Sequence, residues 1–271
     1  MAKNFLIITE GVSTEPTILE AILKKYGFNV IRKNPIRISQ EEQPFSLDIT
    51  ELLDNKKDNI YIAQGPKTRI RDFLNLVNKQ TEDVERYFSQ LSDNFAGIFL
   101  VYDVDHAPKE DLANMFFKFQ DETTGLLILS SPCIEILSEP DRLEELSVNH
   151  LKEYKKERKS WVQDKTSDSI EHYMINNFEE LILSFLYKNC RESGSNNVME
   201  HPEFVLQQIN LKNDRSYIND DFQPVLYRYF TTTLYVCIAY ILGLTKEIDN
   251  SKIVADFFIS HKTHTNSKSE L

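Results

Sequence analysis

The sequence predicts an α/β fold, in which a parallel sheet of about four strands is flanked by helices and followed by a mainly helical C-terminal unit. Two features predict it. Over roughly the first 130 residues, short apolar segments alternate with longer segments whose apolar residues recur at helical spacing. Beyond them the chain becomes charged and then aromatic, without a further strand pattern. Strands that alternate with helices favour right-handed crossovers and therefore a parallel sheet.

The first strand is expected at Asn4–Thr9, a short apolar segment that ends at Glu10. A helix should follow, because Pro16 suits a first turn and Gly27 stands where helices commonly end. The next segment, Phe28–Asn59, has two prolines and mixed charge, and we expect a strand and an irregular insertion there.

Three more strands are expected, at Ile60–Ala63, Gly97–Tyr102 and Gly125–Leu129. The segments that separate them show apolar residues at helical spacing, over Arg69–Leu91 and from Pro108 onward. The predicted order is therefore β-α-β-α-β-α-β.

We expect the α/β part to form one domain at residues 1–140 and a helical domain to follow at 141–271. The segments Ile170–Tyr187 and Pro224–Leu244 are apolar and are predicted to be helices. The aromatic residues of the second segment suit either a protein core or a subunit interface. The helical domain would bind a partner or substrate, or form an oligomer.

The composition narrows the class of protein. The formal net charge of −11 argues against loose binding to nucleic acid, which depends on neutralising phosphates. No apolar run reaches the ~18 residues of a membrane span, and the first residues lack a signal-peptide pattern, so we expect a cytoplasmic protein without a membrane partner. Cys133, Cys190 and Cys237 form no metal motif and are expected to be reduced, mostly buried thiols.

Carboxylates follow two of the expected strands. Glu10 follows the first, and Asp103 and Asp105 follow Gly97–Tyr102. Sites in parallel sheets lie at the carboxyl ends of strands. Residues i and i+2 of an extended chain point to one side, so both aspartates should face one cation. Although Asp-x-Asp alone is also typical of a solvated turn, the addition of Glu10 favours an Mg²⁺ or Mn²⁺ site for phosphoryl transfer.

Four segments resemble a known family. FLIITEG at Phe5–Gly11 and IFLVYDVDH at Ile98–His106 resemble the two signature motifs of the Toprim fold. EGVSTEP at Glu10–Pro16 resembles the opening of the small RloB-like and AbiL-like Toprim proteins, which are related to the OLD nucleases. SSPCIEILSE at Ser130–Glu139 resembles their SNPCFE segment. The resemblance covers about residues 4–140.

The resemblance implies an Mg²⁺-dependent nuclease of bacterial phage defence that acts beside an ABC-type ATPase. We expect the chain to be an endonuclease and the toxic effector of such a system, and the aromatic C-terminal half also suits a homodimer. Glu10 would be the general acid or base, and Asp103 and Asp105 the metal ligands. The substrate would be RNA, such as transfer RNA, or DNA. Ser131 and Ile134 depart from the family pattern, which has Asn and an aromatic residue there.

Three residues are candidates for a supporting role. Glu15 and Glu135 stand in the family-like segments, and His106 directly follows the aspartates. Each has a simpler explanation as well: Glu15 as a carboxylate at a helix N-terminus, Glu135 as a solvated residue after a strand, and His106 as an exposed loop histidine. The sequence leaves these alternatives open.

Two basic groups are candidates for contacts to nucleic acid. The first follows the strand at Ile60–Ala63, on the expected edge of the acidic residues. The second lies in the basic stretch KEYKKERK near Trp161, which equally suits a solvated helix face. The candidates are Lys67, Arg69 and Arg71 in the first group, and Lys155 and Lys156 in the second.

Two other functions fit the same residues. A non-catalytic sensor or assembly subunit would use the fold only to bind a partner or a phosphorylated ligand. A primase-like nucleotidyl-transfer enzyme would use the same metals, but the sequence contains no zinc ribbon. Loss of function in a folded Glu10 variant would separate an enzyme from a sensor.

Overall fold

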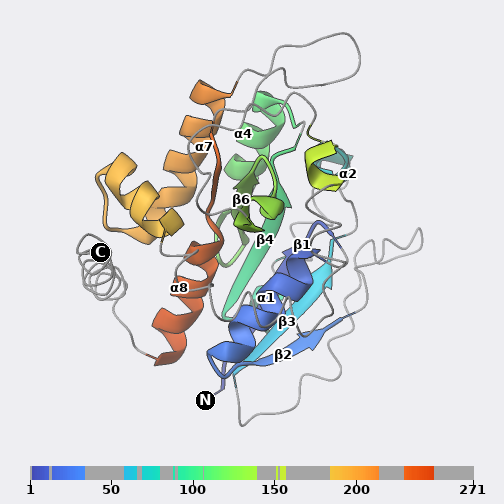
Figure 1. The fold of residues 1–271 in the computed structure, drawn as a ribbon. Helices are drawn as coiled ribbons and strands as arrows, with labels where there is room; N and C mark the ends of the chain where they lie inside the picture. The colour runs from blue at the N-terminus through green and yellow to red at the C-terminus, as the bar shows by residue number, and fades with distance from the viewer. Residues whose placement is uncertain are drawn as a thin grey trace, which may run out of the picture.

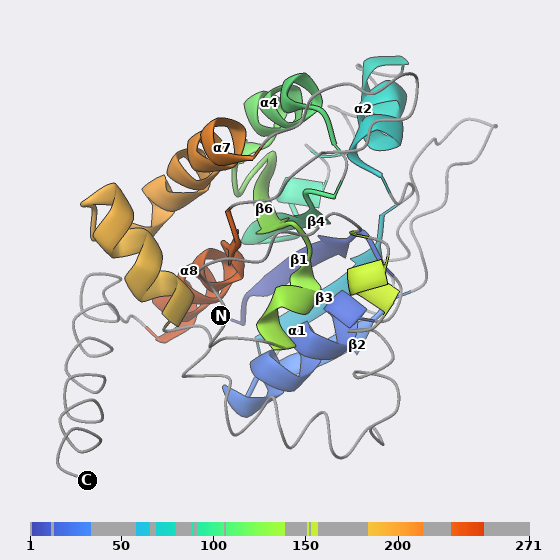
Figure 2. The same ribbon diagram turned by 45° about the horizontal axis from the view of Figure 1, so that its top comes forward.

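The fold is α/β, with a mixed, mostly parallel sheet between two layers of helices and a helical C-terminal part (Figure 1, Figure 2). The computed structural model describes residues 2–11, 14–33, 58–65, 69–79, 88, 91–105, 107–138, 151, 153–156, 184–213 and 229–246.

The sheet has the order β2-β3-β1-β4-β6-β5, and β7 also pairs with β6. The pairs β2–β3, β3–β1, β1–β4 and β4–β6 are parallel, whereas β5 and β7 run antiparallel to β6. The strands are β1 (Asn4–Thr9), β2 (Asn29–Arg32), β3 (Asn59–Gln64), β4 (Gly97–Asp103), β5 (Gln120–Asp121), β6 (Gly125–Ser131) and β7 (Thr231–Thr232).

The predicted α/β class and the parallel core are confirmed. The four expected strands are β1, β3, β4 and β6, and each is buried almost throughout because helices cover both faces. The sheet is larger than predicted and mixed in direction. β2 falls in Phe28–Asn59, where a strand was expected, while β5 and β7 are short strands without an apolar pattern.

The prediction of one helix over Pro224–Leu244 is wrong in its first part. Thr231–Thr232 form β7, and α8 (Leu234–Lys246) begins two residues later. The Ser130 and Thr232 hydroxyls lie 2.9 Å apart, and the Thr233 N–H donates to the Leu129 carbonyl at 2.9 Å. Threonine is β-branched and favours strands, so the run of three threonines was the available signal.

The alternation of side chains along β1 divides the core into two clusters, one on each face. Phe5 and Ile7 pack with α1 and α8, whereas Leu6 and Ile8 pack with α2, α4 and α7 (Figure 2). These helices are α1 (Thr14–Lys25), α2 (Ile70–Lys79), α4 (Lys109–Lys118) and α7 (His201–Lys212), and two short 3-10 helices are η1 (Ile134–Ser138) and η3 (Val198–Glu200). Most of residues 80–90, in the second half of the predicted Arg69–Leu91 helix, lie outside the described residues.

The C-terminal elements share their core with the sheet. Val205 and Ile209 of α7 belong to the cluster of Leu6, and Tyr235 of α8 belongs to the cluster of Phe5. The division into domains at residue 140 stays a prediction, but both clusters extend across it. The buried aromatic residues near α8 therefore contribute to the core.

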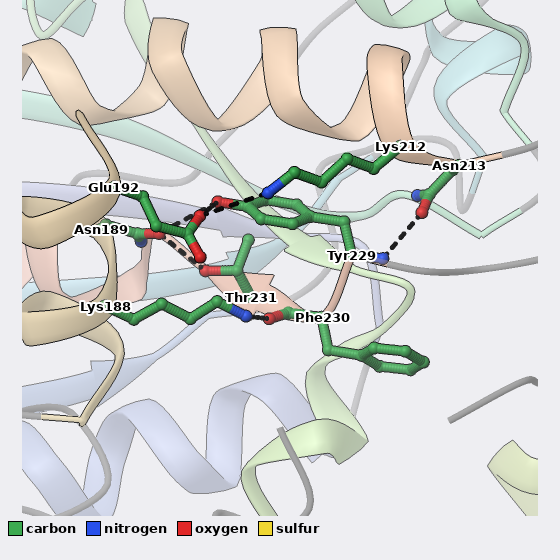
Figure 3. A network of polar contacts seen from close by, with 8 residues as sticks. All are labelled: Lys188, Asn189, Glu192, Lys212, Asn213, Tyr229, Phe230 and Thr231. Carbon is green, nitrogen blue, oxygen red and sulfur yellow. Dashed lines mark hydrogen bonds and ion pairs between the residues drawn. The ribbon is translucent and has the colours of Figure 1, made fainter. Parts of the chain in front are cut away.

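A polar network ties the chain before β7 to two helical segments (Figure 3). The Tyr229 hydroxyl donates to Glu192 Oε2 at 2.9 Å, and the Tyr229 N–H donates to Asn213 Oδ1 at 2.9 Å. The ammonium groups of Lys188 and Lys212 lie 5.0 and 4.5 Å from the centre of the Tyr229 ring, within the range of cation–π contacts. Tyr229 is thereby fixed between the helical residues 184–193 and the end of α7.

Cys133, Cys190 and Cys237 are free thiols, and all three are buried as expected. Among the described residues, no helix has the length and hydropathy that crossing a bilayer requires.

Two substitutions on α7 test whether this helix belongs to the core. Ile209 is fully buried, whereas Leu211 is 77% exposed. We expect Ile209→Ala to lower the free energy of unfolding by about 2–5 kcal/mol, because it removes buried methyl groups and leaves a cavity. Leu211→Ala should change it by less than about 0.5 kcal/mol. Urea unfolding followed by circular dichroism measures both, and equal effects would contradict the packing.

Candidate functional site at the carboxyl ends of β1 and β4

The acidic residues meet because β1 and β4 are parallel neighbours. Thr9 is in register with Val101, so both strands end at the same edge of the sheet. Glu10 continues β1 by one further hydrogen bond, from its N–H to the Val101 carbonyl at 3.0 Å. Gln64 at the end of β3 donates to the Glu10 carbonyl at 3.3 Å. The backbone of Glu10 is thus held on both sides.

The carboxylates of Glu10, Asp103 and Asp105 converge at this edge. Each offers an oxygen atom, and these atoms all lie within 4.8 Å of one another. The sequence predicted this convergence from alternation along an extended chain, but the geometry differs. β4 ends at Asp103, and Asp105 turns back with φ of 43°, a conformation that aspartate tolerates better than most residues.

Backbone groups orient Asp103 and Glu10. Asp103 is only 4% exposed, and its Oδ1 accepts a hydrogen bond of 2.9 Å from the N–H of Ile134, in the first turn of η1. The N–H of Asp103 in turn donates to Glu10 Oε2 at 3.0 Å. The two carboxylates are therefore held by contacts among three segments: the ends of β1 and β4, and η1, which follows β6.

Lys155 supplies a positive charge inside the site. Its Nζ lies 2.9 Å from Asp103 Oδ2 and 2.6 Å from Asp105 Oδ1. Leu151 and Tyr154 anchor its short helical segment in the core. We predicted Lys155 as a contact to nucleic acid, and the structure places it among the carboxylates, whereas Lys156 is exposed.

The sequence contained a signal for the position of Lys155. Residues 151, 154 and 155 have the i, i+3, i+4 spacing of one helix face, and the first two are apolar. That spacing sets Lys155 apart from the rest of the basic stretch. It predicts an ammonium group at the border of the core, where a buried carboxylate is its natural partner.

Glu15 and Glu135 are buried close to the three carboxylates, each 6% exposed. Glu15 lies in the first turn of α1, and its Oε2 fills the space where a side chain at Gly11 would begin. Glu135 lies in η1, and its carboxylate, the Asp103 carboxylate and the Cys133 thiol form a second group of atoms within 4.8 Å. The expectation of a solvated Glu135 is therefore excluded.

This crowding changes the protonation of the site. Burial, together with the Asp105 carboxylate, raises the pKa of Glu10 to about 8. Burial also raises the pKa of Asp103 well above its usual range, and that of Glu15 as well. Burial would lower the pKa of Lys155, but the Asp103 and Asp105 carboxylates outweigh it and raise that pKa. Without a further cation, the site holds protons on groups that are ionised in water.

The residues fit a hard divalent cation. Glu10, Asp103 and Asp105 offer oxygen atoms only, which suits Mg²⁺ or Mn²⁺. Cys133 would suit a softer metal, but burial and the nearby Glu135 raise the pKa of its thiol well above the usual range. Cys133 belongs to the other group, with Asp103 and Glu135, and not to the group of these three carboxylates.

Two of the four remaining predicted residues lie in the described part of the chain. Lys67 and His106 lie outside the described residues. Arg69 is exposed just before α2. The Nε of Arg71 pairs with Asp111 Oδ2 on α4 at 3.0 Å. A role of these side chains in binding nucleic acid stays a prediction.

Comparisons of the chain with protein-family models, with curated protein sequences and with solved structures found no match. The motifs and the geometry of the site are therefore the features of the chain that bear on its function.

The raised pKa of Glu10 predicts how stability depends on pH without metal. Between about pH 4.5 and 8 the folded chain keeps a proton on Glu10 that the unfolded chain loses, so the free energy of unfolding should fall as the pH rises. Glu10→Gln removes this contribution. Its stability relative to wild type should rise over the same range, by at most about 1.4 kcal/mol per pH unit.

Urea unfolding in chelator at several pH values measures this difference. The difference between the two proteins reports Glu10 together with the change that its charge makes in the pKa of Asp103. A difference that stays constant from pH 5 to 8 would contradict the assignment.

Proposed function

We propose that the chain is a metal-dependent phosphodiester hydrolase of the Toprim type. The observation that supports this most strongly is the convergence of Glu10, Asp103 and Asp105 at the carboxyl edge of a parallel core, on the motifs that resemble the Toprim signatures. The sheet order, with β1 between β3 and β4, is what brings these motifs together.

In the proposed mechanism Asp103 and Asp105 hold Mg²⁺ or Mn²⁺, and Glu10 faces the same position. The ion would neutralise charge that develops on the phosphoryl group and orient the attacking water. Glu10 would transfer the proton, because its carboxylate converges with those of Asp103 and Asp105, and a carboxyl group at the reacting centre is a common general acid or base. The Ile134 N–H keeps Asp103 Oδ1 in place, and Oδ2, which pairs with Lys155 at 2.9 Å, would be the oxygen that Asp103 offers to the ion.

We propose that the substrate is nucleic acid, either RNA such as transfer RNA or DNA, and that the chain is a cytoplasmic effector of phage defence controlled by an ABC-type ATPase. The net charge of −11 supports presentation of the substrate by a more basic partner. The aromatic residues of the C-terminal half lend this no support, since Tyr229, Phe230 and Tyr235 are buried in the core. A homodimer stays a proposal, although the burial of these residues removes the apolar surface that suggested it.

Metal binding is the first test. We expect wild-type protein to bind Mn²⁺ in a calorimetric titration and to gain thermal stability from it. Asp103→Asn should weaken binding by about 10–100-fold or more, because it removes a ligand charge. Glu110→Gln removes an exposed carboxylate from α4 and should leave binding unchanged. Equal affinities in all three proteins would exclude this metal site.

Cleavage is the second test. In cells that express the chain with the proposed ATPase partner, Glu10→Gln should abolish toxicity and phage immunity. With purified complex and Mn²⁺, it should slow cleavage of labelled transfer RNA or DNA by about 10²–10⁴-fold, the usual effect of removing a general acid or base. Glu153→Gln, an exposed carboxylate near Lys155, is the matched control. Full phage immunity with a folded Glu10→Gln protein, without cleavage by the wild-type complex, would favour the sensor function instead. Cleavage in excess chelator would exclude the metal mechanism.

A further inference from the structure

Lys155 occupies the part of the site that a metal ion would need. Its ammonium group contacts Asp103 Oδ2 and Asp105 Oδ1, the two carboxylates proposed as ligands. The other Asp103 oxygen already accepts the Ile134 N–H, and Glu10 Oε2 accepts the Asp103 N–H. Asp103 Oδ2 is therefore the oxygen that accepts no backbone hydrogen bond from the described residues. An ion that binds Asp103 there would contact the same oxygen as Lys155.

The two cations repel each other at this distance. An Mg²⁺ ion lies about 2.1 Å from its oxygen ligands, so an ion on the same two oxygens would stand within roughly 5 Å of the ammonium group. Two positive charges at such a separation in a partly buried site repel each other strongly, because little water lies between them to screen the interaction. Ion and ammonium therefore compete for the same carboxylates.

The ammonium group can leave without unfolding its helical segment. Leu151 and Tyr154 are 4% and 8% exposed and hold the segment in the core, whereas the Lys155 side chain is 26% exposed. The four-carbon stem of lysine is flexible and can carry the charge to water. A change in side-chain conformation is then enough to open the site.

We propose that Lys155 is the internal counter-ion of the carboxylate site, which holds Asp103 and Asp105 together before metal binds and which the divalent ion displaces. This inference rests on the proposed function. Under this inference, Lys155 lowers the affinity of the site for metal. The concentration of free ion, or a partner that binds the Lys155 side chain, then determines whether the site holds a metal ion.

The test is Mn²⁺ affinity, measured by calorimetry on wild-type protein, Lys155→Met, Lys155→Arg and Lys156→Met. Lys155→Met removes the charge and keeps most of the stem, so it should bind Mn²⁺ about tenfold tighter or more. Lys155→Arg keeps the charge and should bind like wild type. Lys156→Met removes an exposed charge next to it and should also bind like wild type. In chelator, Lys155→Met should have a lower Tm than wild type. Adding Mn²⁺ should raise the Tm of Lys155→Met by more than it raises that of wild type.

The outcomes separate this inference from the proposed function. If Asp103→Asn loses Mn²⁺ binding but Lys155→Met binds no tighter than wild type, the counter-ion role is wrong and the metal site stands. If neither wild type nor Lys155→Met binds Mn²⁺, both are wrong. Binding by Lys155→Met together with weak or no binding by wild type would be the strongest support.

A measurement on wild-type protein covers the case in which Lys155→Met does not fold. Lysine acetylation followed by mass spectrometry compares Lys155 with its exposed neighbour Lys156. Mn²⁺ should raise the labelling of Lys155 relative to Lys156 several-fold, because the displaced ammonium group reaches solvent. An unchanged ratio under conditions where Mn²⁺ stabilises the protein would overturn the inference.

Discussion

Mutual repulsion among carboxylates at one buried edge is the constraint around which this structure is organised. Glu10, Asp103 and Asp105 lose hydration and face one another, and Glu15 and Glu135 add to the negative field. Such crowding persists only where the surrounding backbone prevents the side chains from separating. Here parallel β1 and β4 fix the main-chain positions, and amide donors on neighbouring segments hold the oxygens.

Much of the fold could be predicted because its central strands are fully buried. Runs such as those of β1 and β4 are apolar on both faces, which distinguishes them from half-exposed strands without any knowledge of partners. β7 could not be found in the same way. Two threonines become a strand only because Ser130 and Ser131 offer them a partner edge, and that information lies a hundred residues away in the chain.

The site was predictable to a similar degree and for a similar reason. Glu10 and Asp103 follow recognisable strands, so strand order alone suggested their meeting. The left-handed turn at Asp105 and the position of Lys155 depend on tertiary contacts, with the Pro132 carbonyl in the first case and with the core around Leu151 and Tyr154 in the second. The local sequence pattern shows which charged side chains are present, whereas contacts between distant parts of the chain determine which of these side chains lie together.

The pairing of β6 with β7 has a consequence for synthesis. Ser130 and Thr232 are 102 positions apart, so the ribosome must make most of the second half of the chain before that edge of the sheet can close. The adjoining residues carry the Ile134 amide that orients Asp103. Contacts of such high sequence separation form late, since the entropy of closing the loop must be overcome first. In a nascent chain the Ile134 amide would therefore reach its place late, and Asp103 would lack this donor until β7 has been made.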